Sequence, residues 1–226
     1  MPRPDLDIII NATELRTGTA FRFGNRESGS WQLGSVRAND VELAEAVAAS
    51  AAYPTLLPAI DRHHDFVRKD GSVRRERVVL SDGGIYDNLA TSALEPGRDP
   101  EISFNVFPSR IVISCDAGQG GGLGRPPYVW PERVAAAAAT THRRSHNLTR
   151  SKLFAQERSG DLDALVTAFL GMSDSNIPYA PADLVPKDSA VSYPTDFSPM
   201  TQDDIDILSK RGEQIMGQLA AYYLRI

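Results

Sequence analysis

An aspartate followed by two glycines is the most chemically suggestive feature of the sequence. Asp82, Gly83 and Gly84 come directly after residues 78–81 (Val-Val-Leu-Ser), an apolar run typical of a short buried strand. A carboxylate held at the end of a strand can act as a general base when a proton lies within hydrogen-bond reach. The glycines let the backbone turn sharply without a Cβ in the way. On spacing alone, the same pattern is also typical of an ordinary turn, in which Asp82 only accepts backbone hydrogen bonds.

A serine hydroxyl is a natural partner for such a base, because it is a poor nucleophile until its proton is removed. The usual setting of that serine is Gly-x-Ser-x-Gly. No serine among the 226 residues stands in this pattern. The segment 171–175 (Gly-Met-Ser-Asp-Ser) comes closest, but its last position is serine. The sequence therefore offers a candidate base and no nucleophile.

The other polar clusters do not predict a metal or cofactor site. His142 and His146 can share one face of a helix, but the glutamate of His-Glu-x-x-His and a third ligand are absent. His63 and His64 stand among charged residues, and we interpret both as surface residues. The glycine-rich segment 120–125 lacks the Lys-Ser/Thr ending of a phosphate loop and indicates a flexible loop after a strand.

Several elements must position Asp82 and its neighbours. Short apolar or alternating runs predict strands over 7–10, 19–24 and 31–36. A helix is expected from Asn39, where Glu42 gives a capping-box spacing, until Pro54 biases the chain away from helical geometry.

The second half is expected to be mainly helical. Residues 111–114 predict another buried strand, and Cys115, in the same apolar run, would be a small core residue. Helices are expected over 131–158 and 162–170, and from Thr201 to the end of the chain.

Three ordered segments resemble the bacterial patatin-like phospholipases. They are residues 9–24 (Ile-Ile-Asn-Ala-Thr-Glu-Leu-Arg-Thr-Gly-Thr-Ala-Phe-Arg-Phe-Gly), residues 46–54 (Ala-Val-Ala-Ala-Ser-Ala-Ala-Tyr-Pro) with Pro58, and Asp82-Gly83-Gly84-x-x-x-Asn88. The tail from Pro194 through residues 211–213 is also similar, so that the resemblance covers nearly the whole chain. It implies a three-layer α/β/α fold, with residues 1–226 forming the C-terminal portion of a single domain and no second domain.

The resemblance also implies an activity. Members of that family are lipid acyl hydrolases with a Ser–Asp dyad and no cofactor, in which Asp82 would be the base and Gly83 and Gly84 its motif. Asn88 would bond the loop so that Asp82 is aimed correctly, although a turn or helix-start asparagine fits its position equally well. The nucleophile and the oxyanion glycine loop would lie before residue 1. The alternative is a non-catalytic fragment or partner module that does no chemistry on its own.

Composition limits the other possibilities. The net charge of −5, with interspersed signs, lacks the basic footprint of a nucleic-acid binder. The single cysteine rules out an intrachain disulfide, and no apolar stretch approaches the roughly 20 residues of a membrane span. We expect a cytoplasmic or peripheral membrane protein that acts on acyl lipids or phospholipids. The sheet edge at residues 8–10 would be uncovered and could promote self-association.

Overall fold

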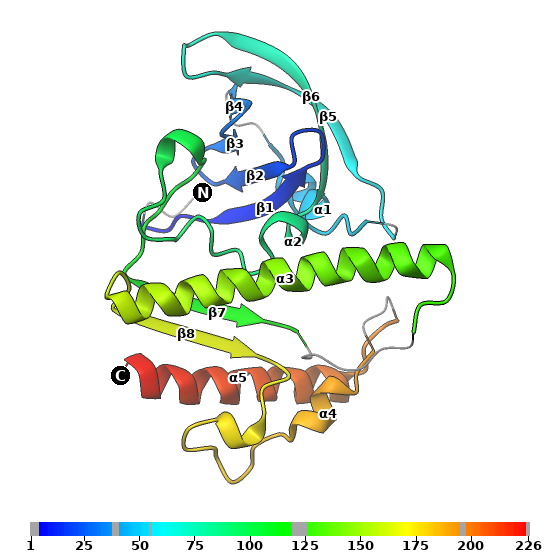
Figure 1. Ribbon diagram of the computed structural model, residues 1–226, viewed down its shortest axis with the longest axis vertical. Helices are drawn as coiled ribbons and strands as arrows, with labels where there is room; N and C mark the ends of the chain where they lie inside the picture. Colours follow the sequence, from blue (N-terminus) through cyan, green and yellow to red (C-terminus); the bar gives the residue numbers. More distant parts are fainter. Residues whose placement is uncertain (1–4, 38–40, 55, 119–125, 195–197, 225–226) are drawn as a thin grey trace. The chain divides into compact units, whose positions relative to one another are not determined.

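A computed structural model describes residues 5–37, 41–54, 56–118, 126–194 and 198–224. The chain divides into two compact units, the first formed by Met1–Ser109 with Thr140–Arg150 and the second by Arg110–Ala139 with Ser151–Ile226 (Figure 1). The long helix α3 (Trp130–Ser159) contributes residues to both. The assignment of the chain to a single domain stays a prediction, because a division into compact units does not show that either unit folds alone.

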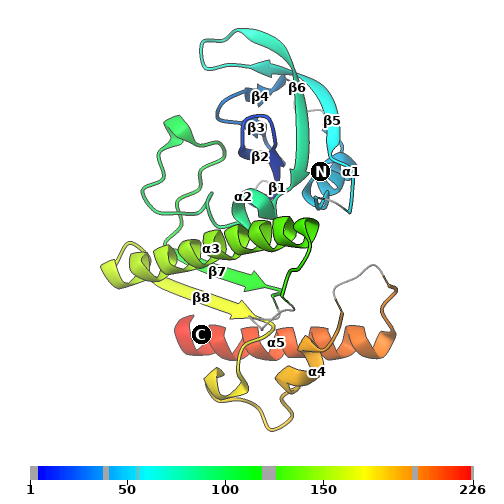
Figure 2. The ribbon, with the colours of Figure 1, turned by 45° about the vertical axis from the view of Figure 1, so that its right-hand side comes forward.

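A closed barrel of six antiparallel strands forms the first unit (Figures 1 and 2). In chain order the strands are β1 (Ile9–Glu14), β2 (Thr19–Gly24), β3 (Ser28–Ser30), β4 (Gly34–Val36), β5 (Ile60–Val67) and β6 (Val73–Asp82). The barrel closes where β6 pairs with β1, with Ala12 opposite Asp82. Phe21, Phe66 and Leu80 are fully buried in its core.

The charged segment at residues 61–77 forms most of a long hairpin between β5 and β6. Gly71, with φ of 79°, lies in the turn, where a left-handed conformation favours glycine. Charged side chains lie on both faces of this hairpin, and some pair across it, as when Arg77 donates to Asp61 over 2.9 Å. Phe66 and Val78, which share one face of the paired strands, are buried in the core. These two side chains therefore join the polar segment to the barrel core.

Two short helices accompany the barrel. Helix α1 (Leu43–Ser50) buries Ala46 and Ala49 against the core, and these small side chains let the helix approach closely. Helix α2 (Gly84–Asp87) begins two residues after β6 ends.

The second unit is built on a two-stranded parallel sheet of β7 (Ile111–Asp116) and β8 (Ala164–Phe169). Helix α5 (Gln202–Leu224) packs on β8, where Ile215 and Leu219 join Val166 in a common core. The remaining elements of the chain are η2 (Pro100–Ile102), η3 (Asp174–Asn176) and α4 (Lys187–Val191). In the part of the chain described here, no helix is long and apolar enough to cross a membrane.

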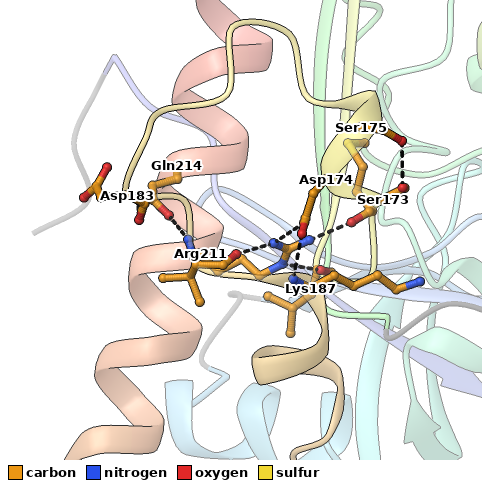
Figure 3. A network of polar contacts seen from close by, with 10 residues as sticks. Ser173, Asp174, Ser175, Asp183, Lys187, Arg211 and Gln214 are labelled. Atoms are coloured by element: carbon orange, nitrogen blue, oxygen red, sulfur yellow. Dashed lines mark hydrogen bonds and ion pairs between the residues drawn. The ribbon is translucent and has the colours of Figure 1, made fainter.

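A buried arginine ties the loops of the second unit to α5 (Figure 3). Arg211 is fully buried and donates to the carbonyl groups of Leu170, Met172 and Val185 over 2.9, 2.6 and 2.5 Å. It also pairs with Asp174 at 2.9 Å. A buried guanidinium is tolerated because its donors are satisfied in this way.

The predicted three-layer α/β/α patatin-like fold is wrong, because the structure has a closed antiparallel barrel and a small separate parallel sheet. A layered parallel sheet needs a crossover, usually a helix, between successive strands. Here α1 is the one helix among the described residues between the six barrel strands, and the other connections are short turns that favour antiparallel neighbours.

Two local predictions in the second unit are also wrong. Residues 162–170 contain strand β8 instead of a helix, because Leu165, Val166 and Thr167 suit a half-buried sheet. Cys115 is exposed, because β7 turns only its Val112 and Ser114 side into the interior.

Candidate functional site

Asp82 is the last residue of β6, at one end of the barrel wall. It follows Val78 and Leu80 in the alternation of the strand, and both of these side chains are buried in the core. Its cross-strand partner, Ala12, is buried as well. Asp82 therefore lies on the inward side of the sheet where the strand ends, and its side chain is only partly buried.

Backbone hydrogen bonds fix Asp82 from two sides. The Thr13 hydroxyl of β1 donates to the Asp82 carbonyl over 2.8 Å. The Asp82 N–H donates to the carbonyl of Ala52, just beyond α1, over 3.0 Å, and the Ser81 hydroxyl donates to the same oxygen over 2.7 Å. The three segments of the sequence resemblance, which contain Thr13, Ala52 and Asp82, are thus brought together at this point.

The two glycines after Asp82 have close neighbours of different kinds. A Cβ at Gly83 would overlap the carbonyl oxygen of Asn11 on β1, a backbone atom. A Cβ at Gly84 would lie 2.8 Å from the Asp82 Oδ1 atom and 2.8 Å from the Asn88 Oδ1 atom, which are side-chain ends that can shift. Gly83 therefore needs glycine for space, although its φ is not positive.

The two oxygens of the Asp82 carboxylate differ in their surroundings. Oδ1 accepts the Gly84 N–H over 2.7 Å, which fixes the orientation of the side chain. Among the residues that the structure describes, none donates to Oδ2. A carboxylate with one oxygen held and the other open can accept a proton from a group that approaches it.

Asn88 is exposed and lies next to the turn, since its Oδ1 atom is one of the two that crowd Gly84. Its amide nitrogen lies 3.1 Å from the Nδ1 atom of His146 on α3. No hydrogen bond joins the Asn88 side chain to Asp82 within the described ranges. The structure thus brings Asn88 to the site, while its role in aiming Asp82 stays a prediction.

A buried polar cluster behind α2 was not predicted from the sequence. Asp87 accepts the Ser92 N–H over 2.8 Å, and Arg22 on β2 donates to the Ser92 hydroxyl over 2.8 Å and to the Phe104 carbonyl. Burial, and then the charge of Arg98, lower the pKa of Arg22 from its usual value, while Asp87 acts in the opposite direction. In an alternating strand such as Phe21-Arg22-Phe23 an arginine normally points to solvent, so no sequence signal marked this one as buried.

Three buried polar atoms near this cluster lack a hydrogen-bond partner among the described residues. They are the Oδ1 atom of Asn11, the Nε atom of Arg22 and the hydroxyl of Thr91. Asn11 and Arg22 face each other across β1 and β2. Buried polar atoms of this kind commonly bind internal water.

The other candidate residues from the sequence are distant from Asp82 along the chain. Among the described residues, none of them forms a hydrogen bond with Asp82. Ser173, in the nearest approach to a nucleophile motif, contacts Ser175 in the second unit at 3.0 Å and is exposed. The glycine-rich segment 120–125 is not among the described residues. His64 lies in β5, where it contacts Glu45 at 3.2 Å, and His63 is exposed in the same strand. The described residues contain no group of three or more side chains suited to a metal ion.

Comparisons with protein-family models, curated proteins and solved structures found no significant match to the chain.

Proposed function

We propose that this chain carries the general base of a Ser–Asp lipid acyl hydrolase, with Asp82 as the base. The substrates are carboxylic esters of phospholipids or related acyl lipids. The serine nucleophile and the oxyanion donors belong to polypeptide outside these 226 residues. One observation carries the proposal: Asp82 has Oδ1 held by Gly84, no donor to Oδ2 among the described residues, and a backbone anchored by the two other segments that resemble patatin-like phospholipases.

The chemistry assigns a single task to each group. The serine oxygen attacks the acyl carbonyl while Asp82 Oδ2 takes the hydroxyl proton, and backbone N–H groups stabilise the oxyanion. The alcohol leaves with that proton, and an acyl-serine remains. Water then attacks the acyl-serine and gives a proton to Asp82, which passes it to the departing serine oxygen, so that the carboxylic acid is released and both groups return to their starting state.

Exposed apolar side chains near the site support a lipid substrate. Val47 is exposed about one turn before Ser50, the last residue of α1, whose carbonyl accepts the Gly83 N–H over 3.3 Å. Ile85 is exposed on α2, three residues after Asp82. Exposed apolar side chains beside the site suit an acyl chain better than they suit a polar substrate.

Ester hydrolysis tests the proposal. The 226-residue chain alone should hydrolyse p-nitrophenyl butyrate at the uncatalysed rate, because it has no nucleophile. A polypeptide that joins it to an upstream Gly-x-Ser-x-Gly segment should be active, and Asp82→Asn should lower kcat/KM about 10²- to 10⁴-fold.

The matched control is Asp70→Asn, in the exposed β5–β6 turn. Asp70 also accepts a backbone N–H two residues on, from Ser72 over 2.9 Å, but it lies at the opposite end of β6. Activity that survives Asp82→Asn would disprove the base assignment. Inactivity of every joined polypeptide would favour the non-catalytic module.

A further inference from the structure

Among the residues that the structure describes, strand β7 pairs with β8 along one edge and has no partner along the other. Arg110 and Asp116 accept hydrogen bonds from the Ala164 and Leu170 N–H groups over 3.4 and 3.1 Å, so their carbonyl groups point toward β8. Because backbone groups alternate in direction along a strand, those of residues 111, 113 and 115 point the other way. Within the described part of the chain, nothing pairs with them.

One face of β7 is also uncovered. Ile111 and Ile113 are 54% and 49% exposed, and Cys115 beside them is exposed too. On β8, Val166 and Ala168 share that face but are covered by α5 through Ile215 and Leu219. Parallel sheets are normally covered on both faces, so an exposed apolar face beside an open edge marks an interaction surface.

We propose that β7 pairs antiparallel with β7 of a second copy of this chain, centred on Ile113, to give a continuous four-stranded sheet. In this register Ile113 lies opposite Ile113 of the second copy, and Ile111 lies opposite Cys115. The outward residues 111, 113 and 115 of each strand would form six hydrogen bonds across the pair.

The charges at the two ends of β7 select this arrangement. The sequence from 110 to 116 is Arg-Ile-Val-Ile-Ser-Cys-Asp, so centring on Ile113 sets Arg110 of each copy opposite Asp116 of the other. Arg110 already pairs with Asp163 through Nε and one terminal nitrogen, which leaves its second terminal nitrogen to reach the second copy. Parallel pairing in register would instead set like charges side by side, which is destabilising. The exposed ion pairs thus fix orientation more than affinity.

Molecular mass in solution tests the pairing. At about 100 μM chain, light scattering should give twice the 24.6 kDa chain mass, falling toward one chain mass on dilution. Ile113→Glu should give a single-chain mass at every concentration, because two carboxylates would face each other at the centre. Ile102→Glu, at an isoleucine that is 59% exposed in the other unit, should leave the dimer unchanged.

Crosslinking tests the register. Ile111→Cys would face Cys115 of the second copy within disulfide reach, whereas Cys115 and Cys115 of the two copies would be about 14 Å apart. Oxidation with copper phenanthroline should therefore crosslink Ile111→Cys but neither the native chain nor the Ile111→Cys/Cys115→Ser double variant. A native chain that stays single at about 100 μM, or that crosslinks through Cys115 alone, would overturn the proposal.

Discussion

Two aspartates in this chain end a strand in the same way. Gly84 donates its N–H to Asp82 Oδ1 over 2.7 Å, and Gly118 donates to Asp116 Oδ1 over 2.8 Å. This contact is therefore a property of the local turn and does not by itself mark a catalytic base. Asp82 is distinguished by what surrounds it, because its backbone is also bonded to the Thr13 hydroxyl and to the segment after α1.

At the same scale, Gly83→Ala should destabilise the barrel. Its Cβ would overlap the Asn11 carbonyl oxygen, a backbone atom in a paired strand that cannot move aside freely. Overpacking of this kind costs about 1–3 kcal/mol of unfolding free energy, to be measured by urea denaturation. Gly217→Ala is the control: it lies in α5 with open space around it and should stabilise by up to about 1 kcal/mol. Equal effects at the two glycines would contradict the close contact.

Asp174 should make stability depend on pH in the acidic range. Burial acts to raise its pKa, but hydrogen bonds from Arg211 and from the Lys187 N–H outweigh burial and hold the pKa below its usual value. Because the folded pKa is the lower one, the stabilisation is complete above about pH 4, the unfolded value, and is lost as pH falls through the folded pKa.

Asp174→Asn should therefore lower the free energy of unfolding at pH 7 and flatten its decline below about pH 4. Urea denaturation at a series of pH values measures both effects. Asp188→Asn, at an exposed residue of α4, serves as the control. An unchanged acidic slope in Asp174→Asn would show that this ion pair does not stabilise the fold.

Among the elements, α5 depends on Arg211 for its link to the preceding loops. Arg211→Leu would leave the carbonyl groups of Leu170, Met172 and Val185 without their donor. We expect a loss of about 3 kcal/mol, because breaking a buried polar network leaves unsatisfied groups behind.

Lys210→Met gives the comparison, since Lys210 precedes Arg211 on the same helix and pairs with Asp183 at the surface. Because solvent screens an exposed pair of this kind, we expect its loss to change the free energy of unfolding far less than the loss of Arg211 does. Similar losses for the two variants in urea denaturation would contradict a special role of the buried arginine.

Helices and strands could be predicted from the sequence where the hydrophobic pattern fits only one of the two. The strand over 19–24 was predicted at its observed bounds, and the helix over 131–158 within one residue of α3 at each end. The pattern over 162–170 is short and apolar, which suits a helix and a strand equally, and tertiary pairing with β7 decided the outcome. The glycines after Asp82 were likewise predicted to turn the chain, but the atoms they avoid become apparent only when β1 is folded against β6.

At the scale of the whole molecule, the described residues form two hydrophobic cores that have no residue in common. One, around Phe66, fills the barrel, and the other, around Val166, lies between β8 and α5. The single layered sheet was expected from the resemblance to patatin-like phospholipases, and strand periodicity, which does not specify whether neighbouring strands run parallel, could not correct it. Turn lengths carry that information, and the charged segment at residues 61–77 concealed strand β5 and the first half of β6, of which only the end at 78–81 was predicted.

Separate cores predict separate responses to a cavity. Phe66→Ala should raise amide hydrogen exchange most in β1 to β6, while Val166→Ala should raise it most in β8 and α5. Hydrogen exchange followed by mass spectrometry of peptides measures both patterns. Exchange that rises evenly over the whole chain for each variant would indicate one cooperative structure.

The most direct test of Asp82 as the base is a labelling rate. The rate is that at which the serine nucleophile reacts with a fluorophosphonate, measured in a polypeptide that joins this chain to a Gly-x-Ser-x-Gly segment. The base takes the serine proton in that step, so Asp82→Asn should slow labelling by about 10²-fold or more, while Asp70→Asn should leave it unchanged. Labelling of Asp82→Asn at the unsubstituted rate would contradict the assignment.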